Sequence, residues 1–223
     1  MRRPGILPGF LSLIFLSCQA QQNQDASSSP TRAPNMRSLG SQSCEDCELM
    51  FVNMPDNILS SDTTDGWFEP GQKLKISGTV LQPDQETPAP GVIVYYYHTD
   101  QKGYYAPGNK PDAGSHKHGR LRGWVKTGVD GQYSIYTSRP AQYPDNKFEA
   151  HIHVIIKESD LNSPYWIDEW VFDDDPLLTP ANKSRMENRG GSGVLEIKYE
   201  GDLQVTYHDI ILGLNIPGYP ASK

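Results

Sequence analysis

Two histidines separated by one residue carry the strongest chemical signal in the sequence. His151 and His153 lie in the segment 150–157, which is otherwise rich in aliphatic residues. Side chains of a β-strand alternate between two faces, so both imidazoles project from one face and the aliphatic residues between them from the other. Polar side chains that leave water need hydrogen bonds or a metal ion. The pattern therefore predicts a metal site on one face of a strand whose other face packs into the core.

A His-x-His strand by itself leaves the identity of the site open. Zinc hydrolases, cupins and copper proteins use the same pattern, so zinc or copper is one alternative. The alternative without a metal is a pair of polar residues on a solvent-facing sheet surface. The surrounding sequence has to decide among these interpretations.

The segments that must position the histidines are typical of short strands joined by turns. Runs rich in β-branched and aromatic residues occupy 73–81, 91–98, 122–127, 132–137, 150–157, 168–172, 193–199 and 203–212. We expect about eight strands, a hairpin at Asp130–Gly131, a second hairpin turn at 200–202 and one short helix after Thr179. Short strands at regular spacing favour an all-β fold, a β-sandwich or a barrel.

Length and charge limit the classes of function. The chain has 223 residues and a formal net charge of −7, with no basic stripe. One domain is the expected number at this length, and it can bury a core without help from disulfides. Nucleic acid is therefore not an expected partner.

The N-terminus has the features of an export signal. Two arginines precede an apolar run, 6–16, which is followed closely by Cys18. This arrangement is typical of a secretory signal, and the run is too short to span a membrane as a helix. We expect a lipoprotein-type signal over 1–18, with membrane anchoring through lipid on Cys18; ordinary cleavage near Ala20 is the alternative. In both cases we expect an exported protein, in the cell envelope or secreted.

The rest of the chain divides into a linker and a domain. Residues 19–43 are rich in Gln, Ser, Asn, Pro and Thr, which predicts a flexible linker before a domain over 44–223. Cys44 and Cys47 at the start of that domain could form a disulfide loop, a redox pair or half of a metal site. No second Cys-x-x-Cys accompanies them, and we favour a structural disulfide.

An ordered series of motifs over about 75–157 resembles the intradiol ring-cleavage dioxygenases, the family of the catechol, protocatechuate and hydroxyquinol dioxygenases. That family shows a strand, Gly-x-Tyr, Arg-Gly, Thr-Asp-x-x-Gly-x-Tyr, a Pro-rich turn ending in Tyr, and Pro-Ala-His-Ile-His. The corresponding segments here are Gly91–His98, Gly103–Tyr105, Leu121–Trp124, Thr127–Tyr133, Arg139–Tyr143 and Ala150–His153. The order and spacing of the series are far more specific than any one motif.

The resemblance implies a four-residue iron site on a β-sandwich. Tyr105 matches the tyrosine that stays bound to the metal as an equatorial tyrosinate. Tyr143 matches the axial tyrosinate that the substrate displaces. His151 and His153 match the axial and equatorial histidines. Two phenolates stabilise Fe(III) over Fe(II), so the implied cofactor is Fe(III).

The resemblance also implies a reaction. The family cleaves a catechol-type ring between its two hydroxylated carbons with O2, so the expected partners are a small aromatic diol and O2. A ferric ion acidifies a bound diol, and Tyr143 would be the catalytic residue that leaves the metal and helps take a substrate proton. No reductant is implied, and the sequence leaves the particular diol and the oligomeric state open.

One position departs from the pattern of the family. Where the family has an arginine that lines the substrate pocket, this chain has Phe148. Arg122 and Lys147 are the candidate substrate-binding residues in its place, and Arg139 is a further cation that could reach the site. The helical dimerisation region of the cytosolic catechol enzymes has no counterpart here, so the chain resembles the short, exported members of the family.

A non-catalytic binding module is the competing interpretation. The Gly-Val-x-Val strand and the motif at 127–133 also resemble transthyretin-like and carboxypeptidase-regulatory-like sandwiches, which need no metal. The set of two tyrosines and two histidines distinguishes the enzyme from such a module. We assign no function to the acidic run 173–175, which is typical of a turn, or to the second His-x-His at 116–118. The latter fits a solvated loop that could border the pocket.

Overall fold

The computed structural model describes residues 44, 46–109 and 111–220. The expected signal peptide with Cys18 and the expected linker over 19–43 lie outside the described residues. Within the described part of the chain, no helix is long and apolar enough to cross a membrane.

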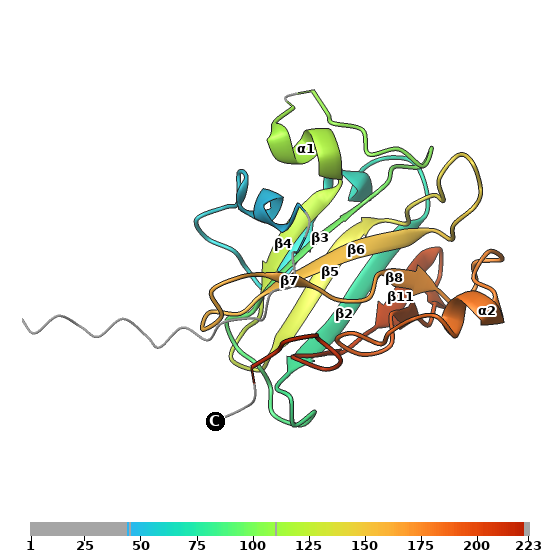
Figure 1. Ribbon diagram of the computed structural model, residues 1–223. Coiled ribbons are helices and arrows are strands. Elements are labelled where there is room, and N and C mark those ends of the chain that lie inside the picture. Colours follow the sequence, from blue (N-terminus) through green and yellow to red (C-terminus); the bar gives the residue numbers. More distant parts are fainter. Residues whose placement is uncertain (1–43, 45, 110, 221–223) are drawn as a thin grey trace, which may run out of the picture. The chain divides into compact units, whose positions relative to one another are not determined.

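The strands of the described part form two six-stranded sheets (Figure 1). The first sheet has the order β1 (Ser61–Thr63), β5 (Gln132–Ser138), β2 (Lys73–Leu81), β11 (Leu203–Tyr207) and β10 (Lys198–Glu200), with β12 (Ile210–Ile211) paired to β2. The second has the order β4 (Arg122–Lys126), β3 (Ile93–His98), β6 (His151–Lys157), β8 (Trp170–Phe172) and β9 (Val194–Leu195), with β7 (Tyr165–Trp166) paired to β6. The connections include the helices α1 (Ala113–His118) and α2 (Pro180–Lys183) and the 3-10 helices η1 (Cys47–Phe51) and η2 (Asp65–Trp67).

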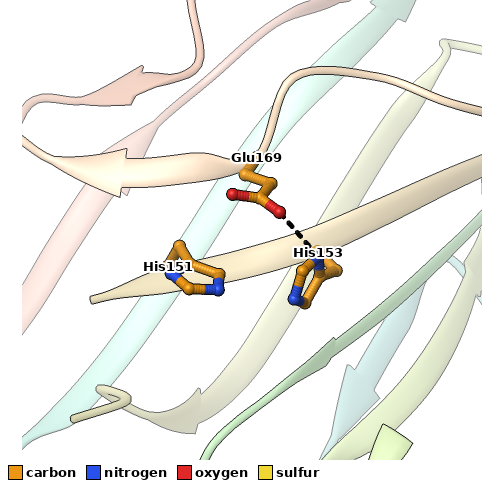
Figure 2. A group of neighbouring side chains, drawn as sticks. All are labelled: His151, His153 and Glu169. Carbon is orange, nitrogen blue, oxygen red and sulfur yellow. Dashed lines mark ion pairs between the residues drawn. The ribbon is translucent and has the colours of Figure 1, made fainter. Parts of the chain in front are cut away.

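The main core lies between these sheets and confirms the expected all-β sandwich. Side chains of β2 and β5 from the first sheet form one buried cluster with side chains of β3 and β6 from the second. β6 contributes Ile152, Val154 and Ile156 to this cluster, and its histidines His151 and His153 project together from the opposite face (Figure 2). The alternation expected for this strand is therefore confirmed.

The strand expected over 73–81 is present to the residue as β2. The last run, 203–212, is divided into β11 and β12, which pair with β2 at successive positions. Between them the carbonyl of His208 approaches Gly78 so closely that a Cβ on Gly78 would stand 1.7 Å from the oxygen. The chain therefore leaves the regular ladder at His208 and rejoins it at Ile210. The run expected over 193–199 is likewise divided, into β9 and β10.

The expectation of a β-hairpin at Asp130–Gly131 is wrong. The turn exists, and the Gly131 amide donates to the Gly128 carbonyl at 3.0 Å. However, β4 before it pairs with β3, whereas β5 after it pairs with β2 in the other sheet. Turn residues indicate that the chain reverses, but the burial of apolar faces decides which strands pair. The hairpin expected at 200–202 is confirmed, and so is the helix after its N-cap Thr179.

Part of the outer face of the second sheet is covered by the segment that contains η1. A disulfide joins Cys44 and Cys47, whose Cα atoms lie 5.4 Å apart. Cys47 and Met50 are buried in a small cluster with Tyr95 of β3 and Ile155 of β6. This segment bounds one side of the surface on which the histidines stand.

Candidate metal centre

Four side chains from three segments meet on the outer face of β6. The phenol oxygens of Tyr105 and Tyr143 lie 2.8 Å apart. The Tyr105 oxygen lies 2.8 Å from Nε2 of His153, and the Tyr143 oxygen lies 3.1 Å from Nε2 of His151. Tyr105 follows β3, Tyr143 follows β5, and the histidines belong to β6. The structure thus brings together the four residues that the sequence suggested as ligands.

Close contact between two loops places the tyrosines side by side. The Ala141 amide donates to the Asp100 carbonyl at 3.3 Å, which ties the loop of Tyr143 to the loop of Tyr105. Gly103 has a φ of +79°, and a Cβ on it would stand 2.2 Å from the Gln142 carbonyl oxygen. Glycine permits both the backbone conformation and the close approach. The glycine of the Gly-x-Tyr motif therefore lets the two loops meet.

Hydrogen bonds behind the imidazoles fix which nitrogen faces the centre. His151 Nδ1 lies 2.8 Å from the Glu149 carbonyl oxygen, which can only accept a hydrogen bond, so Nδ1 carries the proton. His153 Nδ1 lies 2.9 Å from a carboxylate oxygen of Glu169 (Figure 2). A carboxylate likewise accepts, which places the proton of His153 on Nδ1. Both Nε2 lone pairs are then free to bind a cation, an arrangement common around metal-binding histidines.

Glu169 is a functional candidate that no motif in the sequence indicated. The sequence predicted a strand over 168–172, but β8 begins only at Trp170, and Glu169 turns toward the histidines. Burial alone would raise the pKa of the Glu169 carboxyl, but the hydrogen bond from His153 and the charges of the imidazoles lower it below its ordinary value. Ligand atoms of His151, His153 and Glu169 lie within 4.8 Å of one another. The only available signal was an acidic residue beside a strand that neighbours β6.

A stack of three rings supports His153 from the β3 side. The ring of Tyr97 lies 4.5 Å from that of His153 and 3.7 Å from that of His118, with nearly parallel planes. His118 Nδ1 also lies 2.8 Å from the phenol oxygen of Tyr95. The expectation that His118 lies in a solvated loop is wrong, because it is a buried residue in the last turn of α1. Asp112, the N-cap residue of α1, was a signal in the sequence for this helix.

The two phenols are protonated in the absence of a cation. Burial raises the pKa of both Tyr105 and Tyr143 above the ordinary value for tyrosine. A nearby metal ion reverses this preference, since it stabilises the phenolate more than burial disfavours it. With metal–ligand bonds of about 2.0 Å, two donors at a right angle stand about 2.8 Å apart. The donor separations of 2.8 and 3.1 Å therefore fit one shared ion.

The acidic run after β8 has structural roles. Asp175 accepts a hydrogen bond from the Ala150 amide at 2.9 Å and so anchors the start of β6 beside the histidines. Asp174 forms an ion pair with Arg139 at 2.6 Å. Arg139 is thus engaged away from the metal centre.

The candidate substrate-binding cations Arg122 and Lys147 form ion pairs with residues outside the centre. The Arg122 side chain is only 6% exposed and forms an ion pair with Asp112 at 2.9 Å, in the lining of a different cavity. The Lys147 side chain is 72% exposed and pairs with Asp145. Phe148, which replaces the arginine of the family, is an exposed residue. The structure therefore pairs both cations with carboxylates outside the centre, and their assignment to the substrate stays a prediction.

A cavity of about 610 Å³ opens beside the centre, along the outer face of β6. His153 and Glu169 line one part of it, and Trp166 of β7 lines another. Arg185, in the segment after α2, is the arginine in its lining. Of the four clustered side chains, His153 is the one that takes part in this lining.

Comparisons with known proteins identify relatives in sequence and in fold. Catechol 1,2-dioxygenase 1 of Acinetobacter lwoffii is 39% identical, over 67% of this chain and 53% of that protein. The crystal structure of the Acinetobacter radioresistens catechol 1,2-dioxygenase matches with a TM-score of 0.56 and 15% identity, over 77% of this chain and 62% of the other. The catechol 1,2-dioxygenase of Acinetobacter sp. ADP1 matches with a TM-score of 0.51 and 18% identity, over 74% and 61%. No protein-family model matches the chain.

Fold and site together define a β-sandwich protein with a cluster of two tyrosines and two histidines on the outer face of one sheet. The chain belongs to the intradiol ring-cleavage dioxygenase family. It spans about half the length of the curated relative that it matches.

Proposed function

We propose that this domain is a non-haem iron dioxygenase that opens the ring of a catechol-type substrate between its two hydroxylated carbons. One carbon–carbon bond of the ring breaks, and both atoms of O2 enter the product, a muconate-type dicarboxylic acid. The proposal is supported by kinship with a catechol 1,2-dioxygenase over two thirds of the chain.

The observation that carries the proposal is the convergence of Tyr105, Tyr143, His151 and His153. Their donor atoms form a continuous series of contacts of 2.8 to 3.1 Å, drawn from three separate segments. A plain binding module has no need for two phenols and two imidazoles aimed at one point. Phenolate and imidazole together favour ferric iron over softer ions.

The residues around the centre have distinct tasks in this proposal. Bound Fe(III) would act as a Lewis acid that ionises the diol and lets the ring donate electron density to O2. Tyr143 is partly exposed and contacts both Tyr105 and His151, so its phenol oxygen can accept a proton when the substrate takes its place. The ring stack behind His153 excludes water from that side of the imidazole.

Oxygen uptake by the iron-loaded protein tests the proposal. We expect consumption of one O2 per catechol, hydroxyquinol or protocatechuate cleaved, with the dicarboxylic product identified by mass. The variant His153→Ala should bind iron poorly and consume no O2. A colourless, iron-free preparation from iron-replete cells, or zinc or copper in its place, would contradict the proposal and favour a binding module or another metal site.

We also propose that the protein is exported, and anchored to a membrane through lipid on Cys18. Support comes from the apolar run at the N-terminus and from the Cys44–Cys47 disulfide, which is typical of oxidising compartments. Replacement of Cys18 by serine should release the protein from the membrane fraction. Unchanged fractionation would contradict the lipid anchor.

A further inference from the structure

The cavity beside the metal centre is larger than a catechol ring requires. Its volume of about 610 Å³ is several times the ~150 Å³ of a cavity that holds one benzene molecule. It extends from His153 past Ile155 to Trp166, which stands opposite Ile155 in the β6–β7 register. His153 and Ile155 are two positions apart on β6, which corresponds to about 7 Å along the strand. The cavity therefore continues well beyond the His153 imidazole. A ring bound at the centre would leave this extension free for a substituent.

The far wall of the extension is an aromatic ring held in place. The guanidinium of Arg189 lies 3.7 Å from the centroid of the Trp166 ring, and Arg189 is itself buried and paired with Glu187. Trp166 nevertheless remains 39% exposed and lines the cavity. A fixed, accessible indole is a favourable surface for an apolar or aromatic group.

The charged residues in the lining are mainly acidic. Four acidic residues line the cavity with a single arginine, Arg185; they are Glu149, Asp168, Glu169 and Glu187. The net charge of these residues stays negative even when Arg189, the partner of Glu187, is counted together with Arg185. A pocket lined by one sign of charge repels ligands of the same sign and lowers their local concentration.

We propose that the substrate is a catechol with an extended substituent that carries no negative charge, and that Trp166 binds this substituent. The inference rests on the ring-cleavage function proposed above and adds a substrate class to it. The two hydroxyl groups lie toward His153, and the substituent follows β6 to the indole. Carboxylated catechols such as protocatechuate are then poor substrates, because their carboxylate enters an acidic cavity.

A matched pair of substrates tests size and charge separately. We would compare kcat/KM for catechol, protocatechuate, 3-(3,4-dihydroxyphenyl)propan-1-ol and 3-(3,4-dihydroxyphenyl)propanoate, and measure dissociation constants for the same compounds without O2. The propanol should exceed both catechol and the propanoate about tenfold in kcat/KM and in affinity. The propanol and the propanoate have the same length, so their ratio reports charge alone.

Two variants assign the effects to residues. Trp166→Ala should remove the advantage of the propanol over catechol, so that the ratio of their kcat/KM values falls from about ten toward one. Glu149→Gln should improve the propanoate relative to the propanol, because one carboxylate is lost from the lining. Phe68→Ala and Glu86→Gln, which alter exposed residues outside the cavity, serve as controls.

The outcomes separate this inference from the proposed function. Equal kcat/KM for catechol and the propanol, or an equal loss for both in Trp166→Ala, would overturn the inference and leave the dioxygenase intact. Preference for the propanoate would overturn the charge argument. Cleavage of none of the four compounds by iron-loaded protein would overturn the function and the inference together.

Discussion

At the scale of single residues, the Nδ1 atom of His153 holds the key hydrogen bond of the centre. Its proton points to the Glu169 carboxylate at 2.9 Å, and this leaves Nε2 to face Tyr105. The carboxylate also places a negative charge behind the imidazole, which makes the ring a stronger donor to a cation. Glu169 would therefore act on a bound cation through His153, as a positioning residue.

Two substitutions of Glu169 separate its hydrogen bond from its charge. Glu169→Ala removes both, and we expect iron affinity to fall about 10- to 100-fold. Glu169→Gln keeps an acceptor for the Nδ1 proton of His153. Its iron affinity should lie between that of Glu169→Ala and that of the unaltered protein. Competition with a chelator measures these affinities. Equal affinity in all three proteins would show that the contact has no influence on the metal.

The two tyrosines should be visible in the spectrum of the iron-loaded protein. Tyrosinate bound to Fe(III) gives a red to purple colour, so Tyr143→Phe should weaken and shift the band, because Tyr105 remains. The double variant with Tyr105→Phe should be colourless. Tyr104→Phe alters the exposed neighbour of Tyr105 and is the control. A spectrum unchanged in Tyr143→Phe would exclude that phenol from the metal.

At the scale of elements, the loop after β3 is critical because it must touch the loop after β5. Gly103→Ala would place a Cβ 2.2 Å from the Gln142 carbonyl oxygen at a positive φ. We expect it to lower the free energy of unfolding by about 1 to 3 kcal/mol and to reduce iron occupancy, since Tyr105 moves away from Tyr143. Urea unfolding and metal analysis measure the two effects.

Gly201→Ala is the matched control for this loop. Gly201 also has a positive φ, +62°, but nothing lies within 4 Å of a Cβ placed on it. Gly201→Ala should lower the free energy of unfolding by about 1 kcal/mol, from backbone strain alone, and leave iron occupancy unchanged. Similar iron loss in both variants would mean that the loop contact does not position Tyr105.

The elements also show how far local sequence determines this fold. The alternation in β6 predicted both its buried stripe and its pair of histidines, because strand periodicity depends only on neighbours in the chain. The link at Asp130–Gly131 was misjudged because the choice of partner strand depends on distant segments. The Glu169 contact joins residues sixteen positions apart through a turn with no motif of its own, so only the folded chain reveals it.

At the scale of the whole molecule, buried histidines make the folded state sensitive to acid. Burial lowers the pKa of His98 and of His208 to about 4, against about 6.5 in the unfolded chain. Between these values the unfolded chain binds protons that the folded protein does not. The stability contributed by the neutral imidazoles is therefore fully present above pH 6.5 and is lost as the pH falls toward 4.

Equilibrium unfolding at a series of pH values checks this expectation. The free energy of unfolding should fall by up to about 1.4 kcal/mol per pH unit for each histidine over that window. His98→Gln removes one titrating group, so it should reduce the slope of the free energy of unfolding against pH by the contribution of one proton. This change in slope is expected whatever the variant does to the stability at neutral pH. A slope unchanged in this variant would show that His98 does not titrate differently in the two states.

The two faces of β6 have different roles, one in core packing and one in presenting the histidines. Ile152, Val154 and Ile156 hold the sheets together, while His151 and His153 stand outside that interior. A substitution of either histidine alters none of the three aliphatic side chains in the core. The same scaffold can therefore lose its reactivity and persist as a folded domain, or acquire reactivity by a few outward-facing replacements, without passing through an unfolded ancestor.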